Sequence, residues 1–398
     1  MKTFEIVILG GGASGVCTAL MACKKYSGTE IAIVEGGERL MRKLAQTGNG
    51  RGNITNKALH PQKFFGDDCS YFIENFNLQN TLDFFTTLGI ETTSIGNKIF
   101  PRSFSASSFV DLLRFSIARE NINVFLSHQI STVKKVGSIF KIQTSSGEIS
   151  AKKIVVALGG CACPHLNTDG FGVKILKSLG HSSTALHPAL VQLKTTSQHT
   201  KTLKGIKSEV VATFSQNGKP LATFADEMHF SEFALSGPVS FLLSTFSAPF
   251  KNGVITVDFL PDTNLENLVS ALSAKANLYR DCDCETLLFT TVANQIARCI
   301  IKEACLNGKK ISQISNADII KIAKITKSFA FDFVGNLSFA KAQSTVGGVP
   351  LAEFDKNLQS IITPNLFACG EALNVCGECG GFNLQWAWSS AFAVSEGL

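Results

Sequence analysis

The chain has 398 residues, of which 45% are hydrophobic and 17% are charged, a composition typical of a globular protein with two or three domains. The formal net charge of +6 is mild and no long basic run occurs, which argues against nucleic acid as a partner. The 12 cysteines are scattered and no apolar run reaches the length of a membrane span, so we expect a cytoplasmic protein with reduced thiols and no membrane partner.

The first predicted elements form a strand–turn–helix–strand unit. Residues 4–9 are an apolar strand, residues 16–25 are predicted to be helical, and residues 31–34 form a second apolar strand. A Gly-x-Gly-x-x-Gly turn at 10–15 connects the first strand to the helix, and Glu35 ends the second strand. This arrangement is the βαβ fingerprint of a dinucleotide-binding site, in the structural context that the motif requires.

The residues of this motif have distinct physical roles. Gly10 permits the tight turn, Gly12 lets the backbone approach a pyrophosphate, and Gly15 lets the helix pack closely against the strand. The free N–H groups at the start of the helix face the phosphates, and Glu35 accepts hydrogen bonds from a ribose diol. The motif predicts a bound dinucleotide without specifying which one.

A polar loop follows the second strand. Residues 47–56 have the sequence Thr-Gly-Asn-Gly-Arg-Gly-Asn-Ile-Thr-Asn and show no apolar periodicity. An ordinary surface turn is one interpretation of such a segment. Its length, its polarity and its place after the dinucleotide motif favour a loop that wraps around the cofactor with backbone N–H groups, amides and one guanidinium.

The next elements return the chain to the sheet. Residues 70–90 and 105–121 are predicted to be amphipathic helices. Residues 122–156 are typical of a small β-meander, whose last, buried strand runs into Gly159 and Gly160. A parallel strand that ends in a Gly-Gly turn is typical of the ligand-binding edge of a doubly wound sheet.

The character of the sequence changes over residues 191–340. Alternating segments at 210–214 and 254–259 predict antiparallel sheet, and residues 264–327 have a mostly helical pattern. A turn-rich island at 230–238 lies between the strands. Since no flexible linker flanks the region, we expect an inserted substrate or cap domain that is packed on its host.

The last segment contains two further glycine motifs. Residues 363–371 are predicted to be a short strand that closes on Gly370-Glu371, and Gly380-Gly381 precedes a small-residue helix over 386–394. The carboxylate of Glu371 can hold a polyol chain. The Gly-Gly turn can place helix N–H groups against an electron-rich ring edge.

The pairing of the N-terminal fingerprint with the late Gly–acid strand resembles the flavin-binding fold of two-dinucleotide-binding-domain flavoproteins. More narrowly, residues 47–56, 235–238 and 370–386 resemble the BaiN/YhiN-like, or aminoacetone-oxidase-like, family of NAD(P)/FAD-dependent oxidoreductases over essentially the whole chain. The resemblance implies an α/β fold in which a Rossmann-like, glutathione-reductase-like FAD-binding domain (1–190 and 341–398) carries an inserted β-barrel plus helical domain (191–340).

The resemblance also implies a set of FAD contacts. The first glycine turn holds the pyrophosphate, Glu35 the adenosine ribose and Glu371 the ribityl chain, while the polar loop wraps the cofactor and the segment after Gly380 faces the pyrimidine side of the flavin. The expected cofactor-binding residues are Gly10, Gly12, Ala13, Ser14, Gly15, Glu35, Lys43, Thr47, Gly48, Gly50, Arg51, Asn53, Gly159, Gly370, Glu371, Gly381, Phe382, Asn383, Leu384 and Gln385.

The catalytic residues are less evident, because a flavin carries the reaction and needs no protein nucleophile. His229, Glu232 and Ser236 are candidates for a proton relay, although each also fits a turn or surface role. The pairs Cys376/Cys379 and Cys161/Cys163 lack the spacing of disulfide reductases, so idle thiols are the default interpretation. Cys282-x-Cys284 has no matching partner pair, and no metal site is expected.

The leading hypothesis is an FAD-dependent oxidoreductase that transfers a hydride on a small organic substrate. No second dinucleotide motif occurs in 190–340, so NAD(P)H is expected to bind transiently as electron donor, or oxygen accepts the electrons. Three alternatives stay open: an amine-type oxidase that releases hydrogen peroxide, a flavin-containing RNA-modifying or RNA-binding protein, and a flavin-free NAD-binding regulator. The sequence specifies neither the substrate nor the oligomeric state.

Overall fold

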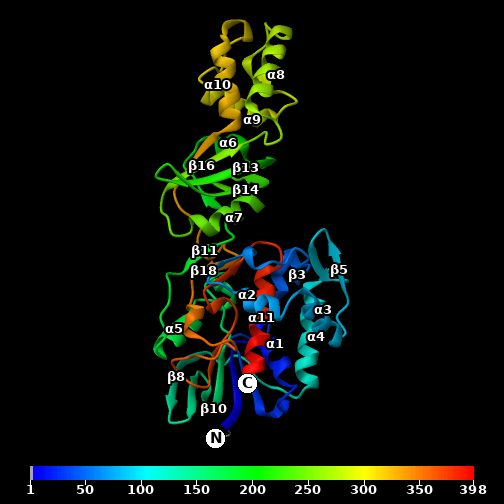
Figure 1. Ribbon diagram of the computed structural model, residues 1–398, viewed down its shortest axis with the longest axis vertical. Helices are drawn as coiled ribbons and strands as arrows, with labels where there is room; N and C mark the ends of the chain where they lie inside the picture. Colours follow the sequence, from blue (N-terminus) through cyan, green and yellow to red (C-terminus); the bar gives the residue numbers. More distant parts are fainter. Residues whose placement is uncertain (1–2) are drawn as a thin grey trace. The chain divides into compact units, whose positions relative to one another are not determined.

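The computed structural model describes residues 3–398 and divides the chain into two compact units. The first unit combines the residues up to 188 with residues 339–398, and the second contains residues 189–338. The first unit is therefore built from two segments that are far apart in sequence (Figure 1).

The first unit is organised around a parallel sheet in the order β7-β2-β1-β10, with β19 pairing on the free side of β10. The strands are in register at their carboxyl ends, because Leu9 pairs with both Val34 and Val156, and Val156 pairs with Ala368. An antiparallel meander of β8 and β9 extends β10 at its other end. The bounds are β1 Thr3–Leu9, β2 Ile31–Val34, β7 Asn123–Phe125, β8 Ile130–Val136, β9 Ile139–Thr144, β10 Gly147–Val156 and β19 Leu366–Ala368.

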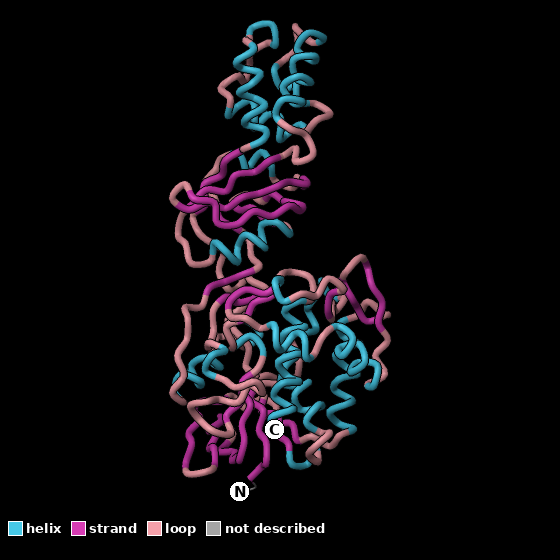
Figure 2. The backbone as a smooth tube through the Cα atoms, in the orientation of Figure 1, coloured by secondary structure: helices cyan, strands magenta, loops and turns pink. Residues whose placement is uncertain are grey.

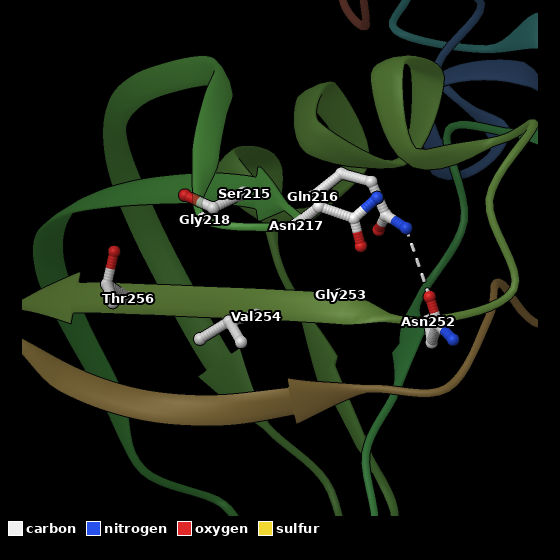
Figure 3. A pocket seen from close by; sticks show the side chains of 8 residues that line it. All are labelled: Ser215, Gln216, Asn217, Gly218, Asn252, Gly253, Val254 and Thr256. Atoms are coloured by element: carbon white, nitrogen blue, oxygen red, sulfur yellow. Dashed lines mark hydrogen bonds between the residues drawn. The ribbon is translucent and has the colours of Figure 1, made fainter.

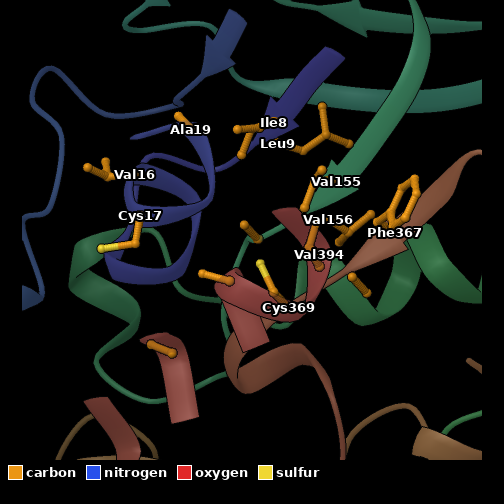
Figure 4. Close-up of a cluster of buried hydrophobic side chains, with 14 of the residues drawn as sticks. Ile8, Leu9, Val16, Cys17, Ala19, Val155, Val156, Phe367, Cys369 and Val394 are labelled. Atoms are coloured by element: carbon orange, nitrogen blue, oxygen red, sulfur yellow. The ribbon is translucent and has the colours of Figure 1, made fainter. Parts of the chain in front are cut away.

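The strands at the centre of this sheet are buried on both faces. Residues 6–9 and 31–34 are fully buried, which explains why they form continuous apolar runs instead of alternating. Helices α1 and α11 pack against each other, α1 also contacts β1, and Val16, Val156 and Val394 belong to the same buried cluster (Figure 4). The helices of the unit are α1 Ala13–Ala22, α2 Ser70–Asn75, α3 Leu78–Thr87, α4 Ala106–Arg119, α5 Phe171–Ser178 and α11 Phe382–Gly397.

Two small sheets lie beside the main sheet of the first unit, and one of them joins early and late parts of the chain. Strand β3 (Thr55–Asn56) pairs with the hairpin of β5 (Thr92–Ile95) and β6 (Lys98–Pro101). Strand β4 (Phe64–Gly66) pairs with β20 (Val375–Gly377), so the region before α11 is held by a strand more than 300 residues upstream. Strand β11 (His187–Ala189) spans the junction between the units, and β18 (Ser344–Val346) follows the return of the chain.

The second unit contains an antiparallel sheet of six strands in the order β12-β15-β14-β13-β16-β17. A bridge between Leu193 and Asn336, with the N–H of Lys194 donating to the carbonyl of Gly335, connects the last strand back to the first and closes a barrel. The bounds are β12 Leu193–Lys194, β13 Lys207–Gln216, β14 Lys219–Phe230, β15 Ala234–Ser236, β16 Gly253–Asp258 and β17 Phe329–Phe333.

Helices complete the second unit, and in Figure 2 those between β16 and β17 form a group of their own beside the strands. Val210, Ala212 and Phe214 of β13 alternate with more exposed residues and fill the barrel together with helix side chains. No helix among residues 3–398 is long and apolar enough to cross a membrane. The helices are α6 His199–Leu203, α7 Pro238–Ser247, α8 Leu265–Leu278, α9 Asn294–Glu303 and α10 Asn316–Lys327.

Several predicted boundaries were wrong for local reasons. The region 70–90 is two helices, because Asn77 accepts hydrogen bonds from the backbone of residues 79 and 80 and starts α3. The island 230–238 is not mainly turn: it contains the end of β14, all of β15 and the start of α7 at Pro238. Helix α11 begins at residue 382, four residues before its predicted start.

A buried histidine cluster ties the end of α5 to the segment after β18. His181 contacts Glu353 through Nδ1 at 2.7 Å and Ser360 through Nε2 at 2.9 Å. Burial by itself would raise the pKa of Glu353, but hydrogen bonds from Ser182 and His181 outweigh it and lower the pKa below its ordinary value of 4.5.

This shift gives a pH prediction. Because the folded pKa is depressed, Glu353 stabilises the fold above about pH 4.5, and this contribution is lost as the pH falls through the lowered pKa. Glu353→Gln should therefore reduce the loss of unfolding free energy between pH 7 and pH 4, by less than about 1 kcal/mol because the carboxylate is partly solvated. Urea unfolding at pH 7 and at pH 4 measures the unfolding free energy of each variant. The exposed Glu74→Gln is the control, and an equal change in both variants would contradict the assignment.

Candidate functional site

The predicted cofactor residues gather at the carboxyl edge of the parallel sheet. Strands β1, β2, β10 and β19 end at this edge, and Gly10, Glu35, Gly159 and Gly370 follow them within three residues. A Cβ atom at Gly370 would lie 2.6 Å from the Oγ of Ser14, so the first and last motifs of the chain touch. Ligands of open α/β sheets bind at this edge, and the structure brings both motifs there.

The glycine turn leaves one open face. A Cβ atom at Gly10 would lie 2.5 Å from the carbonyl oxygen of Ala157, and one at Gly15 would lie 2.1 Å from that of Gly10. A Cβ atom at Gly12 would meet nothing within 4 Å. The first and third glycines are therefore required by packing, whereas Gly12 borders free space.

Helix α1 begins beside this open face. Ala13 is its first residue, no side chain caps it, and its first turn contains no acidic residue. The first N–H groups of a helix lack acceptors within the helix and carry the positive end of its dipole. Ser14 and the residues that follow it in α1 are buried, so the rest of the helix packs into the core. The start of α1 therefore offers N–H donors to an anion next to Gly12.

Glu35 is held rigidly at the end of β2. Its Oε2 accepts a hydrogen bond from the backbone N–H of Gly11 at 2.8 Å, and its Oε1 accepts one from Gly37 at 2.7 Å. The side chain is partly buried. Each carboxylate oxygen retains further acceptor capacity, so the two oxygens can receive the two hydroxyl groups of a ribose.

The second predicted acid, Glu371, is paired with a base. Lys43 Nζ donates to its Oε2 at 2.7 Å, and the backbone N–H of Thr345 donates to its Oε1 at 2.7 Å. Ser344 adds a longer contact at 3.4 Å. Lys43 and Glu371 were each predicted to contact FAD, and in the structure they form one ion pair that offers a donor and an acceptor to a polyol.

The polar loop begins in the short 3₁₀ segment Leu44–Gly50, where Thr47 Oγ1 donates to the carbonyl of Leu44. Gly48 (φ 58°) and Gly50 (φ 80°) adopt left-handed conformations, and a Cβ atom at Gly50 would meet nothing within 4 Å. The side chain of Arg51 is exposed. The loop thus presents backbone and one guanidinium to open space.

The end of the same loop is held in place by hydrogen bonds of two asparagine side chains. The amide of Asn53 is buried and donates to the carbonyls of Thr55 and Ile99, at 2.9 and 3.0 Å. The amide of Asn56 donates to the carbonyl of Gly380 at 2.8 Å. These bonds hold the loop against the start of α11, so the second and last motifs also converge.

Helix α11 starts as α1 does, without a side-chain cap. Gly381 precedes it with φ 105°, and a Cβ atom there would lie 2.6 Å from the carbonyl oxygen of Thr55. The side chain of Phe382 is buried, Leu384 packs partly against the core, and Asn383 binds the backbone N–H of Gly377 at 2.9 Å. The backbone N–H groups at this helix start are therefore candidate flavin contacts.

Gln385 lies wholly inside the core. Its Oε1 accepts from the hydroxyls of Thr55 (2.6 Å) and Thr81 (3.1 Å), and its Nε2 donates to the carbonyl of Phe76 (3.0 Å) and the hydroxyl of Ser389 (3.0 Å). Its amide is therefore satisfied within the protein, and we assign it to positioning α11 and the polar loop.

The residues present fit an extended dinucleotide cofactor. Two uncapped helix starts, the rigid carboxylate of Glu35, the Lys43–Glu371 pair and the open faces at Gly12, Gly50 and Gly159 all belong to one edge of the first unit. FAD carries a pyrophosphate, a ribose, a ribityl chain and an electron-poor ring. The chemistry of each of these groups matches one of these donors or acceptors.

The catalytic candidates lie in the second unit and are only partly brought together. His229 of β14 hydrogen bonds through Nε2 to Glu227, and in the sheet it pairs with Ser236 of β15. Glu232 instead forms an ion pair with Lys204 at 3.0 Å. Sequence analysis missed Glu227, although its position two residues before His229 on one strand places both on the same face.

The cysteines have the properties of structural thiols. Cys376 is fully buried, and this burial raises its pKa to about 12. Burial also raises the pKa of Cys161, while the thiol of Cys163 donates to the carbonyl of Ala342 at 3.4 Å. A high pKa disfavours the reactive thiolate. Within residues 3–398 no cysteine forms a disulfide and no group of side chains has the composition of a metal site.

The ion pair at Glu371 leads to a prediction about cofactor affinity. Glu371→Gln should weaken FAD binding about 10-fold, because the amide cannot accept from Lys43 and a ribityl hydroxyl as strongly as a carboxylate does. FAD titration of the apoprotein measures this effect. Glu378→Gln, which removes the nearby ion pair with Lys63, is the matched control, and equal affinities in the two variants would contradict the assigned role.

The chain has full-length relatives among known proteins. It is 29% identical over 404 residues to a 3-dehydro-bile acid delta(4,6)-reductase of Clostridium scindens, with 98% of each chain covered. It is 25% identical over 409 residues to a ribosomal RNA dihydrouridine synthase of Escherichia coli, covering 100% of this chain and 98% of the relative. A synthase of the same name from Haemophilus influenzae is also 25% identical.

The fold has a counterpart among solved structures. A variant of the quinol fumarate reductase FrdA from E. coli superimposes with a TM-score of 0.50 at 14% identity, covering 100% of this chain and 70% of that chain. The predicted α/β class with a Rossmann-type FAD-binding fold is confirmed, and so is the resemblance to the BaiN/YhiN-like proteins. Residues 4–397 match the family model described as "HI0933-like protein Rossmann domain", and the chain belongs to this family.

Proposed function

We propose that this FAD-dependent oxidoreductase is a reductase that uses NAD(P)H to reduce an unsaturated organic substrate. The observation that carries the proposal is the convergence of the Gly12 turn, Glu35 and the Lys43–Glu371 pair at the carboxyl edge of one sheet. When bound, FAD supplies the hydride carrier, so the protein is left to bind, orient and protonate.

Different residues of the first unit are proposed to hold different parts of the cofactor. The N–H groups at the start of α1 bind the pyrophosphate beside Gly12, and Glu35 binds the adenosine ribose. Lys43 and Glu371 together orient the ribityl hydroxyls. The start of α11 would lie beside the flavin ring, where the positive end of its helix dipole would stabilise negative charge.

The second unit is proposed to be the substrate domain. His229 is the candidate for moving a proton, since the hydrogen bond between its ring Nε2 and the carboxylate of Glu227 fixes the orientation of the imidazole. Ser236, its neighbour across the sheet, is the candidate for orienting a substrate oxygen. We do not propose Glu232 for proton transfer, because its carboxylate forms an ion pair with Lys204.

The direction of the reaction follows from the relatives. The activities of these two relatives, a 3-dehydro-bile acid reductase and a dihydrouridine synthase, are both reductions. A reductase needs an electron donor, and NAD(P)H is the donor we propose.

RNA is the second candidate substrate. Two relatives that cover the chain almost completely are ribosomal RNA dihydrouridine synthases, and the protein carries a net charge of +6. Against it, the basic residues are dispersed instead of forming one stripe. We therefore rank a small organic substrate first and RNA second.

The test is to titrate the FAD-loaded protein anaerobically with NADH, with NADPH and with amines, and to measure the visible absorbance of the flavin during each titration. Bleaching by NADH or NADPH and not by amines is the expected result. Bleaching by amines alone would establish the amine-oxidase alternative and refute the reductase. Addition of an unsaturated steroid or of ribosomal RNA to the bleached protein then shows which substrate restores the absorbance.

A further inference from the structure

The strands of the second unit border, on their outer face, a hollow that the proposed function does not use. It is open, has a volume of ≈ 560 Å³, and includes none of the residues expected to hold FAD (Figure 3). This volume is within the range of small-molecule sites. The lining comes from the β13–β14 hairpin and the first half of β16: Ser215, Gln216, Asn217, Gly218, Asn252, Gly253, Val254 and Thr256.

Two irregularities in the strands border the hollow. The register of β13 against β14 shifts between Phe214 and Ser215, which marks a bulge. The hairpin then turns through Asn217 and Gly218, both with positive φ, as in the two-residue turns that match strand twist. The turn leaves the amide of Asn217 exposed.

Gln216 has an unused hydrogen-bonding atom in this hollow. Its Nε2 donates to the Oδ1 of Asn252 at 3.1 Å, drawn as the dashed line in Figure 3. Its Oε1 is buried without a partner. Exchanging the oxygen and nitrogen of the amide would leave the other atom unpaired, so one buried polar atom lacks a partner in either orientation. Such an atom costs free energy unless a bound group satisfies it.

The chemistry of the lining selects the class of ligand. Three amides and two hydroxyls supply donors and acceptors without charge, and Val254, 42% exposed, adds an apolar surface. Amide pairs of this kind recognise the hydrogen-bonding edges of nucleobases. Lys219 and Lys251 directly flank the lining segments, both are exposed, and no ion pair involves either lysine among residues 3–398. The segments 214–221 and 249–257 contain no acidic residue.

We propose that this hollow is a nucleotide-binding site, in which Gln216, Asn217 and Asn252 bind the base and Lys219 and Lys251 attract the phosphate. A free nucleotide and a nucleotide of a single RNA strand share this chemistry. The site lies wholly within the second unit and does not depend on the flavin reaction.

The experiment titrates the FAD-loaded full-length protein with UMP, AMP and a short single-stranded oligouridylate, by calorimetry and fluorescence anisotropy. Asn252→Ala should weaken binding about 10-fold, which corresponds to about 1.4 kcal/mol. The double variant Lys219→Ala/Lys251→Ala should lower the salt dependence of oligonucleotide binding by about one to two units of slope. Asn252 is not among the residues expected to hold FAD, so its replacement should leave the flavin absorbance unchanged.

The control is Asn277→Ala, which removes an exposed amide on α8 of the same unit. Binding of UMP or AMP with an affinity similar to that of the oligonucleotide assigns the site to free nucleotides, and binding of the oligonucleotide alone assigns it to an RNA strand. The proposal is overturned if the unmodified protein binds none of the three, or if Asn252→Ala and Asn277→Ala bind equally well.

Discussion

Replacing Gly12 by alanine is expected to leave the protein folded and to weaken FAD binding about 100-fold, equivalent to about 2.7 kcal/mol. The backbone at Gly12 has φ −79°, which alanine adopts without strain, and the new methyl group would meet no protein atom within 4 Å. The methyl group would instead occupy the space in which a pyrophosphate approaches the first N–H groups of α1.

The neighbouring glycine provides a matched contrast. At Gly15 the same methyl group would lie 2.1 Å from the carbonyl oxygen of Gly10, so Gly15→Ala should destabilise the packing of α1 on β1 and lower the melting temperature. Fluorescence titration of the apoproteins with FAD, together with thermal unfolding, separates the two effects. Unchanged FAD affinity in Gly12→Ala would contradict the placement of the pyrophosphate.

Replacing Gln385 by leucine is expected to lower the unfolding free energy by about 3 kcal/mol. The buried hydroxyls of Thr55 and Thr81 would lose their shared amide partner, and the carbonyl of Phe76 would lose one of its two donors. These groups belong to β3, α3 and the end of α2, so the loss would loosen the contacts that hold the polar loop against α11.

Chemical unfolding measures this change, and Gln79→Leu on the exposed face of α3 is the control, with an expected effect within about 0.5 kcal/mol. FAD affinity per folded molecule should change little in Gln385→Leu. A variant of unchanged stability that has lost FAD affinity would instead make Gln385 a direct flavin contact.

The parts of the fold that sequence predicts best are those fixed by local chemistry. Residues 4–9 and 31–34 are continuous apolar runs because both faces of the parallel sheet are covered, and that pattern is visible without coordinates. The glycines at 10 and 15 have almost no alternative role once a strand and a helix flank them, since a Cβ atom at either would clash with backbone.

The parts that sequence did not predict depend on distant partners. Lys43 and Glu371 are 328 residues apart in sequence. The parallel pairing of β19 with β10 brings Glu371 close to Lys43. Gln385 belongs to a motif that suggests flavin contact, yet the direction of its side chain follows from the packing of α11 on α2 and α3. Burial and side-chain direction are tertiary properties.

The island at 230–238 illustrates the limit of local patterns. Its glycine and proline indicate a turn, and a turn does occur at Gly237, where φ is 87°. Proline in the first turn of a helix is equally favourable, and α7 starts at Pro238 because the following apolar residues pack into the barrel. The same two residues therefore end one element and begin the next.

The proposed FAD site at the carboxyl edge of the first unit can be tested by the visible absorbance spectrum of the purified protein, with mass spectrometry of the cofactor released on denaturation. We expect one FAD per chain, bound as purified or after incubation with FAD. A protein that stays colourless after incubation with FAD and binds NAD instead would contradict it.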